Sequence, residues 1–309
     1  MIKLLNLITE QTGRPKAVIM AGGAGAGKSF LLNQLQLGSL PLINPDKYIE
    51  DPDHPAFNNL GAGARQADKE AEELGEQGTS FVWDTTASNP KKIQGIINSG
   101  YDVYMIMVYT HPMISYISNF SRSRNVPSVA VFSTWRNVYQ LIEQYNKMLK
   151  GNLSIFVNTR EGKLNKEVEA FNTAAKNGAV GIKDYLKRYN EDNSIEGSSF
   201  FKPVEISSEE EVEFNKAVSG ISYNKDSRGE DKALKKEFLK SFQANGVGPG
   251  EDKLKAALKK YRDSKLKSDE RNDAVLDNIS EMLFSPTFQE LLKHSSVKEI
   301  DQKVQAFLS

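Results

Sequence analysis

A glycine-rich stretch near the start of the chain has the composition and spacing of a phosphate-binding loop. It fits the pattern G-x-x-x-x-G-K-[ST] with Gly22, Gly23, Ala24, Gly25, Ala26, Gly27, Lys28 and Ser29. Small residues let successive backbone N–H groups surround phosphate oxygens, and a helix starting here adds its positive end. We expect these residues, together with Phe30, to bind ATP. In this interpretation Lys28 reaches the β- and γ-phosphates and the Ser29 hydroxyl ligates Mg²⁺.

Two acidic residues follow later apolar runs, where they could take part in phosphoryl transfer. Asp46 comes after the apolar run at residues 40–43, and a carboxylate there could accept the proton of an attacking hydroxyl. The alternative is a residue of a turn or a helix N-cap. Asp84, followed by Thr85 and Thr86, could support Mg²⁺ or bind a substrate hydroxyl. These residues could equally cap the next helix.

Three arginines surround a break at residues 125–127: Arg122, Arg124 and Arg136. Phosphoryl transfer spreads negative charge over three equatorial oxygens, and arginines on a helical lid can neutralise that charge. The alternative is that they lie on solvated helix faces. We expect one or two of the three to be catalytic.

The elements that must position these residues alternate along the chain. Short apolar runs at residues 16–20, 40–43, 80–83, 101–109 and 153–157 predict strands, and residues 200–206 could form another. Amphipathic or helix-rich segments predict helices, among them residues 30–37 and a long helix over residues 129–149. Strands alternating with helices imply right-handed crossovers and an α/β fold with a parallel sheet flanked by helices. Ligands bind such sheets at the carboxyl ends of the strands, where each motif falls.

The second half of the chain has a different pattern. We expect a P-loop kinase-like domain over residues 1–190 and a mostly helical C-terminal extension of unknown role over residues 191–309. Residues 253–267 hold seven basic residues and one acid. This segment could contact nucleic acid, but nearby Asp269, Glu270 and Asp273 cancel much of its charge, which favours a solvated helix face.

Composition limits the function further. The chain has 309 residues, a formal net charge of +0, no cysteine and three histidines. Cysteine-ligated metal sites and disulfides are excluded, and a histidine-rich metal site is not expected. We found no signal peptide pattern and no apolar run long enough to span a bilayer. We therefore expect a cytoplasmic protein with no membrane partner.

With these residues placed, the chain resembles the zeta-toxin family of P-loop kinases, which are related to polynucleotide kinases. The resemblance covers residues 16–159 and includes the P-loop, Asn44-Pro45-Asp46, Asp84-Thr85-Thr86, the lid arginines and Asn158. It implies that Asp46 is the general base, that Lys28 and Ser29 hold ATP and Mg²⁺, that Asp84 binds substrate or supports the metal, and that the arginines form the lid. The family usually has glutamate at Asp84, and polynucleotide-kinase-like members often have arginine at Ile49.

Three hypotheses remain open on the sequence. The first is an ATP-dependent kinase that phosphorylates a hydroxyl of a small acceptor such as a nucleotide sugar, as the resemblance implies. The second is a polynucleotide or modified-base kinase, for which nucleic acid would be the partner; it is possible but not favoured. The third is a non-enzymatic, ATP-gated interaction or assembly module. A toxin role would also predict a protein antitoxin over the ATP site, although no part of the sequence shows one.

Overall fold

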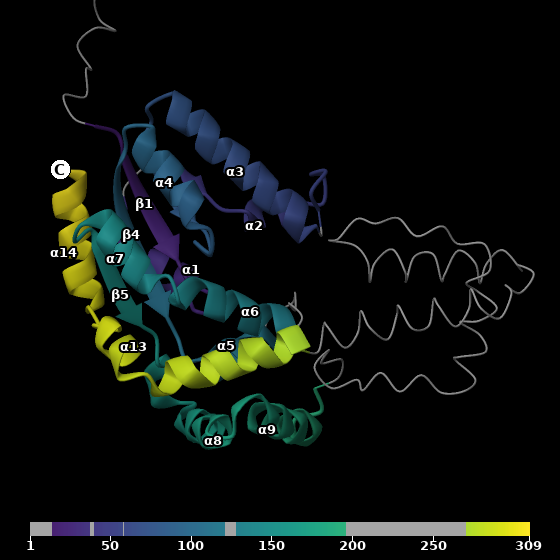
Figure 1. The fold of residues 1–309 in the computed structure, drawn as a ribbon. Helices are drawn as coiled ribbons and strands as arrows, with labels where there is room; N and C mark the ends of the chain where they lie inside the picture. The colour runs from purple at the N-terminus through teal and green to yellow at the C-terminus, as the bar shows by residue number, and fades with distance from the viewer. Residues whose placement is uncertain (1–13, 38–39, 58, 121–127, 196–269) are drawn as a thin grey trace, which may run out of the picture. The chain divides into compact units, whose positions relative to one another are not determined.

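A five-stranded parallel sheet forms the centre of the protein. The computed structural model describes residues 14–37, 40–57, 59–120, 128–195 and 270–309. The strands are β1 (Lys16–Ala21), β2 (Leu42–Ile43), β3 (Phe81–Asp84), β4 (Asp102–Tyr109) and β5 (Leu153–Val157), in the spatial order β2-β3-β1-β4-β5 (Figure 1). The five predicted strands are therefore confirmed, and β1 and β4 are almost fully buried, as central parallel strands should be.

The helices of the first half of the chain connect these strands. They are α1 (Lys28–Leu32), α2 (Asp46–Ile49), α3 (Leu60–Glu76), α4 (Pro90–Asn98), α5 (Pro112–Phe120), α6 (Ser128–Tyr139) and α7 (Ile142–Leu149). The crossover from β1 to β2 runs in one direction across the sheet, and the later crossovers run in the other. Right-handed crossovers therefore put α1 on one face and α3, α4 and α7 on the opposite face (Figure 1).

Some helices differ from the pattern that the sequence predicts. A single long helix was expected over residues 129–149, but the chain leaves α6 at Tyr139 and starts α7 at Ile142. The second helix begins where its buried stripe can cover β4 and β5. The helix expected over residues 30–37 ends at Leu32, because the residues after it form tight turns that include the hydrogen bond from the Leu35 N–H to Leu32 O.

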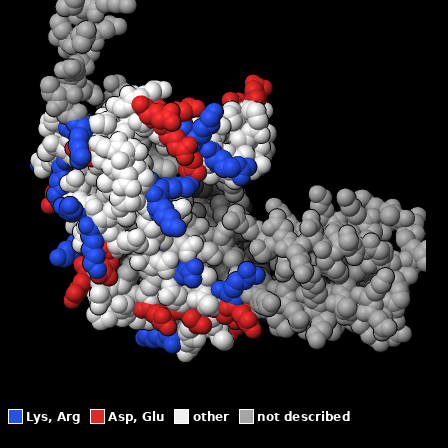
Figure 2. All heavy atoms as spheres, turned by 45° about the horizontal axis from the view of Figure 1, so that its top comes forward, with Lys and Arg blue, Asp and Glu red and all other residues white. Residues whose placement is uncertain are grey.

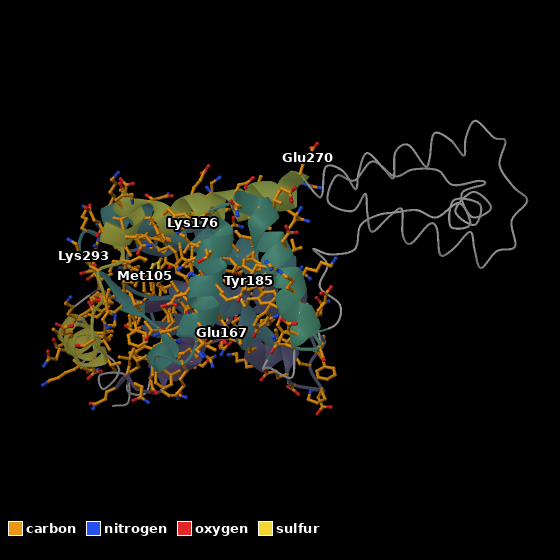
Figure 3. The ribbon with its side chains drawn as sticks, turned by 90° about the horizontal axis from the view of Figure 1, so that it is seen from below. Met105, Glu167, Lys176, Tyr185, Glu270 and Lys293 are labelled. Carbon is orange, nitrogen blue, oxygen red and sulfur yellow. The ribbon has the colours of Figure 1, made fainter. Side chains whose placement is uncertain are left out.

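Two further helices follow the sheet. The connection Arg160–Gly162 leads into α8 (Asn165–Ala175), and Gly178 opens α9 (Gly178–Asp192). Figure 3 shows α8 with Glu167 near its start and Lys176 at its end. Phe171 of α8 stacks on Phe132 of α6, with ring centroids 6.1 Å apart. This contact fixes α8 below the helix pair α5–α6.

The C-terminal segment packs against the sheet, not apart from it. Residues 278–284 are helical, followed by α13 (Pro286–Leu291) and α14 (Val297–Leu308). Ile300 and Val304 of α14 are fully buried in one apolar cluster with residues of α1 and β1. Between α13 and α14, His294 forms an isolated parallel bridge with Ile155, and the Ser295 N–H donates to Ile155 O (2.8 Å). The edge of β5 is therefore covered.

The chain consequently divides into two compact units that are not consecutive in sequence. The first contains residues 1–178 and 278–309, and the second contains residues 179–277. This division differs from the boundary expected after residue 190, because the apolar stripe of α14 completes the core of the sheet. The predicted strand at residues 200–206 and the basic segment at residues 253–267 lie outside the described residues.

The described part of the second unit is small. It consists of α9 from Ala179 onward and residues 270–277. Ile182, Leu186 and Leu276 are fully buried there. Lys183 forms an ion pair with Asp273, and the Ala179 N–H donates to Asp277 Oδ1 (2.7 Å). The two chain ends that enter and leave this unit therefore meet.

Candidate active site

The predicted phosphate loop lies between the end of β1 and the start of α1. Gly25 and Gly27 have φ angles of 75° and 94°, which residues with side chains rarely adopt. A Cβ atom at Gly25 would lie 2.7 Å from Ser115 O, and one at Gly27 would lie 2.3 Å from Asn158 Nδ2. Neighbouring elements thus press closely on the loop, which only glycine allows. The loop that the sequence predicts to bind phosphate is therefore a tightly packed glycine turn.

Lys28 and Asp84 face each other at the carboxyl end of the sheet. Lys28 Nζ lies 3.8 Å from Asp84 Oδ1 and donates to Gly22 O at 3.1 Å. Asp84 is the last residue of β3 and pairs in register with Met20 of β1, so the sheet itself sets its position. Both side chains are largely buried, with exposed fractions of 16% and 8%. A buried charge needs a partner, and here the partner of the loop lysine is the predicted metal or substrate carboxylate.

Asp46 begins α2, immediately after β2. The N-cap of this helix is Pro45, and the Asp46 N–H donates to Asn44 Oδ1 at 2.8 Å. The Asn44 side chain therefore helps to form the turn that leads into α2. Asp46 is half-buried, and it follows the strand beside the one that carries Asp84.

Thr85 and Thr86 continue the chain beyond Asp84. The Thr85 N–H donates to Met20 O at 3.0 Å, which extends the pairing of β3 with β1. The hydroxyls of Thr86 and Ser88 lie 3.1 Å apart. The N-cap of α4 is Asn89, whose side chain accepts from the Lys91 N–H. Neither threonine is therefore needed to cap the helix, and both are half-buried near the Lys28–Asp84 pair.

Of the three predicted lid arginines, Arg136 lies within the described residues. Arg136 lies on α6, half-buried, and its guanidinium donates through Nε (3.2 Å) and Nη2 (2.7 Å) to Asn137 Oδ1. Arg122 and Arg124 lie outside the described residues. Phe30 and Ser29, predicted to contact the nucleotide, are exposed at the start of α1, and Phe30 is 58% exposed.

Two side chains that hold the loop were not assigned a role from sequence. Asn158, after β5, donates from Nδ2 to Ala26 O at 2.8 Å, and its backbone N–H donates to Tyr109 O. Tyr139, at the end of α6, accepts the Gly23 N–H at 3.3 Å. The position of Asn158 directly after the last strand could have indicated a role for it from the sequence. Tyr139 had no such signal, because a tyrosine on the apolar stripe of a helix looks like any core residue.

The donor set suits a hard cation bound together with phosphates. Ser29 offers a hydroxyl and Asp84 a carboxylate, and Mg²⁺ prefers oxygen ligands. No group of three or more potential metal-binding side chains occurs among the residues that the structure describes. Mg²⁺ that is bound with a nucleotide needs only one or two protein oxygens, since phosphates and water supply the rest. The residues present therefore fit Mg²⁺.

Other surfaces are less informative about function. A separate cavity of about 660 Å³ is lined by residues of α3, α4 and β3, among them Asp68, Lys92 and Trp83. It contains none of the predicted site residues. Figure 2 shows acidic and basic side chains interspersed over the described part of the visible face. Within the described ranges, no helix is long and apolar enough to cross a membrane.

Sequence comparison finds one family model that matches part of the chain. Residues 3–150 match the family model described as Zeta toxin. This confirms the resemblance expected from the motifs, and the matched segment contains the P-loop, Asp46, Asp84 and the helix with Arg136. No curated protein has a sequence that matches the chain.

Several solved structures are weakly similar. A protein of the PezAT chromosomal toxin–antitoxin system of Streptococcus pneumoniae is 18% identical, with 50% of this chain and 75% of that chain covered and a TM-score of 0.36. A structure of the AvrRxo1-ORF1:-ORF2 complex with ATP is 14% identical, with 80% of this chain and 81% of that chain covered and a TM-score of 0.39. The sulfotransferase domain of the Synechococcus PCC 7002 olefin synthase is 13% identical, with 74% of this chain and 94% of that chain covered and a TM-score of 0.32. Similarities this weak do not support assigning the function of these proteins to this chain.

Proposed function

We propose that the protein is an ATP-dependent kinase that phosphorylates a hydroxyl of a small acceptor, and the match of residues 3–150 to the Zeta toxin family model supports this proposal. The observation that carries this proposal is the Lys28–Asp84 pair, 3.8 Å apart at the end of the P-loop. A lysine for phosphate and a carboxylate for metal or substrate meet at the carboxyl edge of a parallel sheet. Ligands of such sheets bind at this edge.

In the proposed reaction the P-loop holds the phosphates of ATP. The N–H groups of the loop and the first turn of α1 surround the phosphate oxygens, and Lys28 leaves Asp84 to contact the β- and γ-phosphates. Ser29 and Asp84 would hold Mg²⁺, directly or through water, and the ion would neutralise charge on the β- and γ-oxygens.

Asp46 is the proposed general base. Its carboxylate accepts the proton of the acceptor hydroxyl while the hydroxyl oxygen attacks the γ-phosphorus. The bond between the γ-phosphorus and the β–γ bridging oxygen breaks, and ADP leaves. Arg136, with Arg122 or Arg124, would neutralise the charge on the transferred phosphoryl group. Thr85 and Thr86 would bind the acceptor beside Asp84.

A nucleotide sugar is the acceptor class that the family resemblance favours. A nucleic-acid acceptor would need a continuous basic path to the active site. The chain has a formal net charge of +0, and charges of both signs are interspersed on the face that Figure 2 shows. Ile49 stands where polynucleotide-kinase-like relatives often have arginine. A small acceptor is therefore the stronger proposal.

Transfer of labelled γ-phosphate from ATP tests the proposal. The acceptor panel would contain nucleotide sugars, nucleosides and 5′-hydroxyl oligonucleotides. We expect one class to be labelled by the wild-type chain. Lys28→Ala should abolish transfer because phosphate binding is lost, and Asp46→Asn should reduce it at least about 100-fold because the base is lost.

Matched controls come from an ion pair that lies away from the P-loop. Asp68 and Lys92 form a pair between α3 and α4, so Asp68→Asn and Lys92→Ala remove the same charges without touching the P-loop. Both controls should retain transfer within about twofold, as surface changes usually do. Tight ATP binding with no labelled acceptor class would favour the ATP-gated interaction module. Full activity of Asp46→Asn would rule out Asp46 as the base.

A further inference from the structure

We propose that α6 holds the phosphate loop in its conformation, with Tyr139 as the positioning residue for the nucleotide phosphates. The proposal deepens the proposed function and rests on it for its effect on catalysis. The first observation is that the Tyr139 hydroxyl makes two hydrogen bonds. It donates to Val108 O at 2.7 Å and accepts the Gly23 N–H at 3.3 Å. One hydroxyl therefore joins the second residue of the loop to β4, which lies next to β1 in the sheet.

The environment of Tyr139 keeps this arrangement in place. The residue is 1% exposed, and its ring packs edge-on against Tyr109 with centroids 5.0 Å apart. Burial raises the pKa of the Tyr139 phenol above its ordinary value, so the hydroxyl keeps the proton that it donates to Val108 O. The neutral hydroxyl can therefore donate to the strand and accept from the loop at the same time.

A second residue of α6 brings the helix backbone against the loop. Trp135 is fully buried, and its Nε1 donates to Thr110 O at 2.8 Å, which ties the middle of α6 to the end of β4. A Cβ atom at Gly23 would lie 3.6 Å from Trp135 Cα and 3.9 Å from Tyr139 Oη. The loop backbone thus lies directly on one turn of α6, with no side chain between them.

This contact assigns different roles to different amides of the loop. The Gly23 N–H is used by Tyr139 and the Ala26 N–H donates to Gly23 O, so phosphate binding relies on the other N–H groups of the loop. Asn158 holds the far side of the loop through Ala26 O, and the loop is therefore fixed at two points. Arg136 lies between Trp135 and Tyr139 on the same helix. A single element therefore positions both the loop and a proposed lid arginine.

The substitution Tyr139→Phe removes only the hydroxyl and tests whether α6 holds the loop through it. We expect the dissociation constant for ATP to rise about five- to tenfold, because one hydrogen bond that orders the loop is lost. Tyr101→Phe is the matched control. Its hydroxyl shares one hydrogen between Leu74 O and Thr79 O at the other end of the sheet. Its removal should therefore lower thermal stability about as much as Tyr139→Phe does and leave ATP affinity unchanged.

A second readout needs no nucleotide and no acceptor. In the ATP-free protein, amide exchange of Gly23, followed by NMR, should accelerate at least about tenfold in Tyr139→Phe and not in Tyr101→Phe. Equal exchange in both variants, or equal loss of ATP affinity, would overturn the proposal. If the wild-type chain bound no ATP, the proposed function would fail, and the exchange of Gly23 would still decide whether α6 holds the loop.

Discussion

A partly buried histidine after β4 makes the stability of the fold depend on pH. His111 lies between β4 and α5, where its Nδ1 accepts the Met113 N–H and its Nε2 lies 2.9 Å from Asn172 Oδ1. With Nδ1 accepting, Nε2 carries the proton and donates to Asn172, so the ring is neutral. Burial lowers the pKa of His111 from 6.5 to about 4, although the bond to Asn172 opposes this shift. The folded protein therefore resists protonating a ring that the unfolded chain protonates readily.

The sign of the pH effect follows from that difference. Between pH 6.5 and pH 4 the unfolded state binds a proton at His111 that the folded state does not, so stability falls as the pH is lowered through this range. At pH 5 the loss from this residue would be about 2 kcal/mol. We expect urea unfolding to show a smaller decrease in stability between pH 7.5 and pH 5 for His111→Gln than for the wild type. Equal decreases would contradict a buried neutral His111.

At the scale of residues, the sequence predicts what depends on local spacing. The glycines and Lys28 of the loop are adjacent in the chain, so one pattern predicts the whole phosphate cradle. The pairing of Lys28 with Asp84 could be expected because both residues follow neighbouring parallel strands. Tyr139 could not be predicted, since 116 residues separate it from Gly23 and nothing local distinguishes a core tyrosine from a positioning one.

At the scale of elements, α14 shows how a helix can be predicted while its place cannot. Ser296 and Glu299 form a capping box, and the helix carries an apolar stripe that includes Ile300 and Val304. Both features are local. The contact that positions α14 is long-range, because Asp301 Oδ1 accepts the N–H of Gln36, which is 265 positions away. The helix thus covers the sheet and also binds the chain just after α1.

Truncation of the buried stripe should show what α14 contributes. Ile300 is fully buried in the cluster that contains Leu31 and Leu35, so Ile300→Ala should lower the free energy of unfolding by about 2–5 kcal/mol through lost burial and a cavity. Leu42, on the edge strand β2, is 40% exposed and provides the control. Leu42→Ala should cost less than about 1 kcal/mol in the same urea titration. Equal costs would mean that α14 is not part of the core.

At the scale of the whole molecule, the first unit is built from two distant parts of the chain. Residues 1–178 supply the sheet and the site, and residues 278–309 return to cover the sheet. Within this returning segment, Phe288 of α13 packs against Trp135 and Tyr109, and Val157 donates its N–H to His294 Nδ1. The sequence predicts helices here but gives no sign of this return, because composition and periodicity do not encode which surface a helix covers.

The two parts of the second half of the chain should therefore differ in what their removal does. A chain ending at residue 278 loses Phe288, Ile300 and Val304 from the core of the first unit, and we expect it to lose cooperative unfolding and ATP binding. Replacing residues 180–276 with a short glycine–serine linker removes the second unit instead. The ends can be joined because the Ala179 N–H already lies 2.7 Å from Asp277 Oδ1.

This internal deletion should fold and bind ATP within about twofold of the wild type, since the site lies wholly in the first unit. Circular dichroism during heating and ATP titration would measure both variants. Normal ATP binding by the chain ending at residue 278 would show that the returning segment is dispensable. Failure of the internal deletion to fold, with a longer linker as well, would show that the second unit supports the first. Survival of the internal deletion together with loss of the truncated chain would establish residues 179–277 as an insertion in a discontinuous kinase fold.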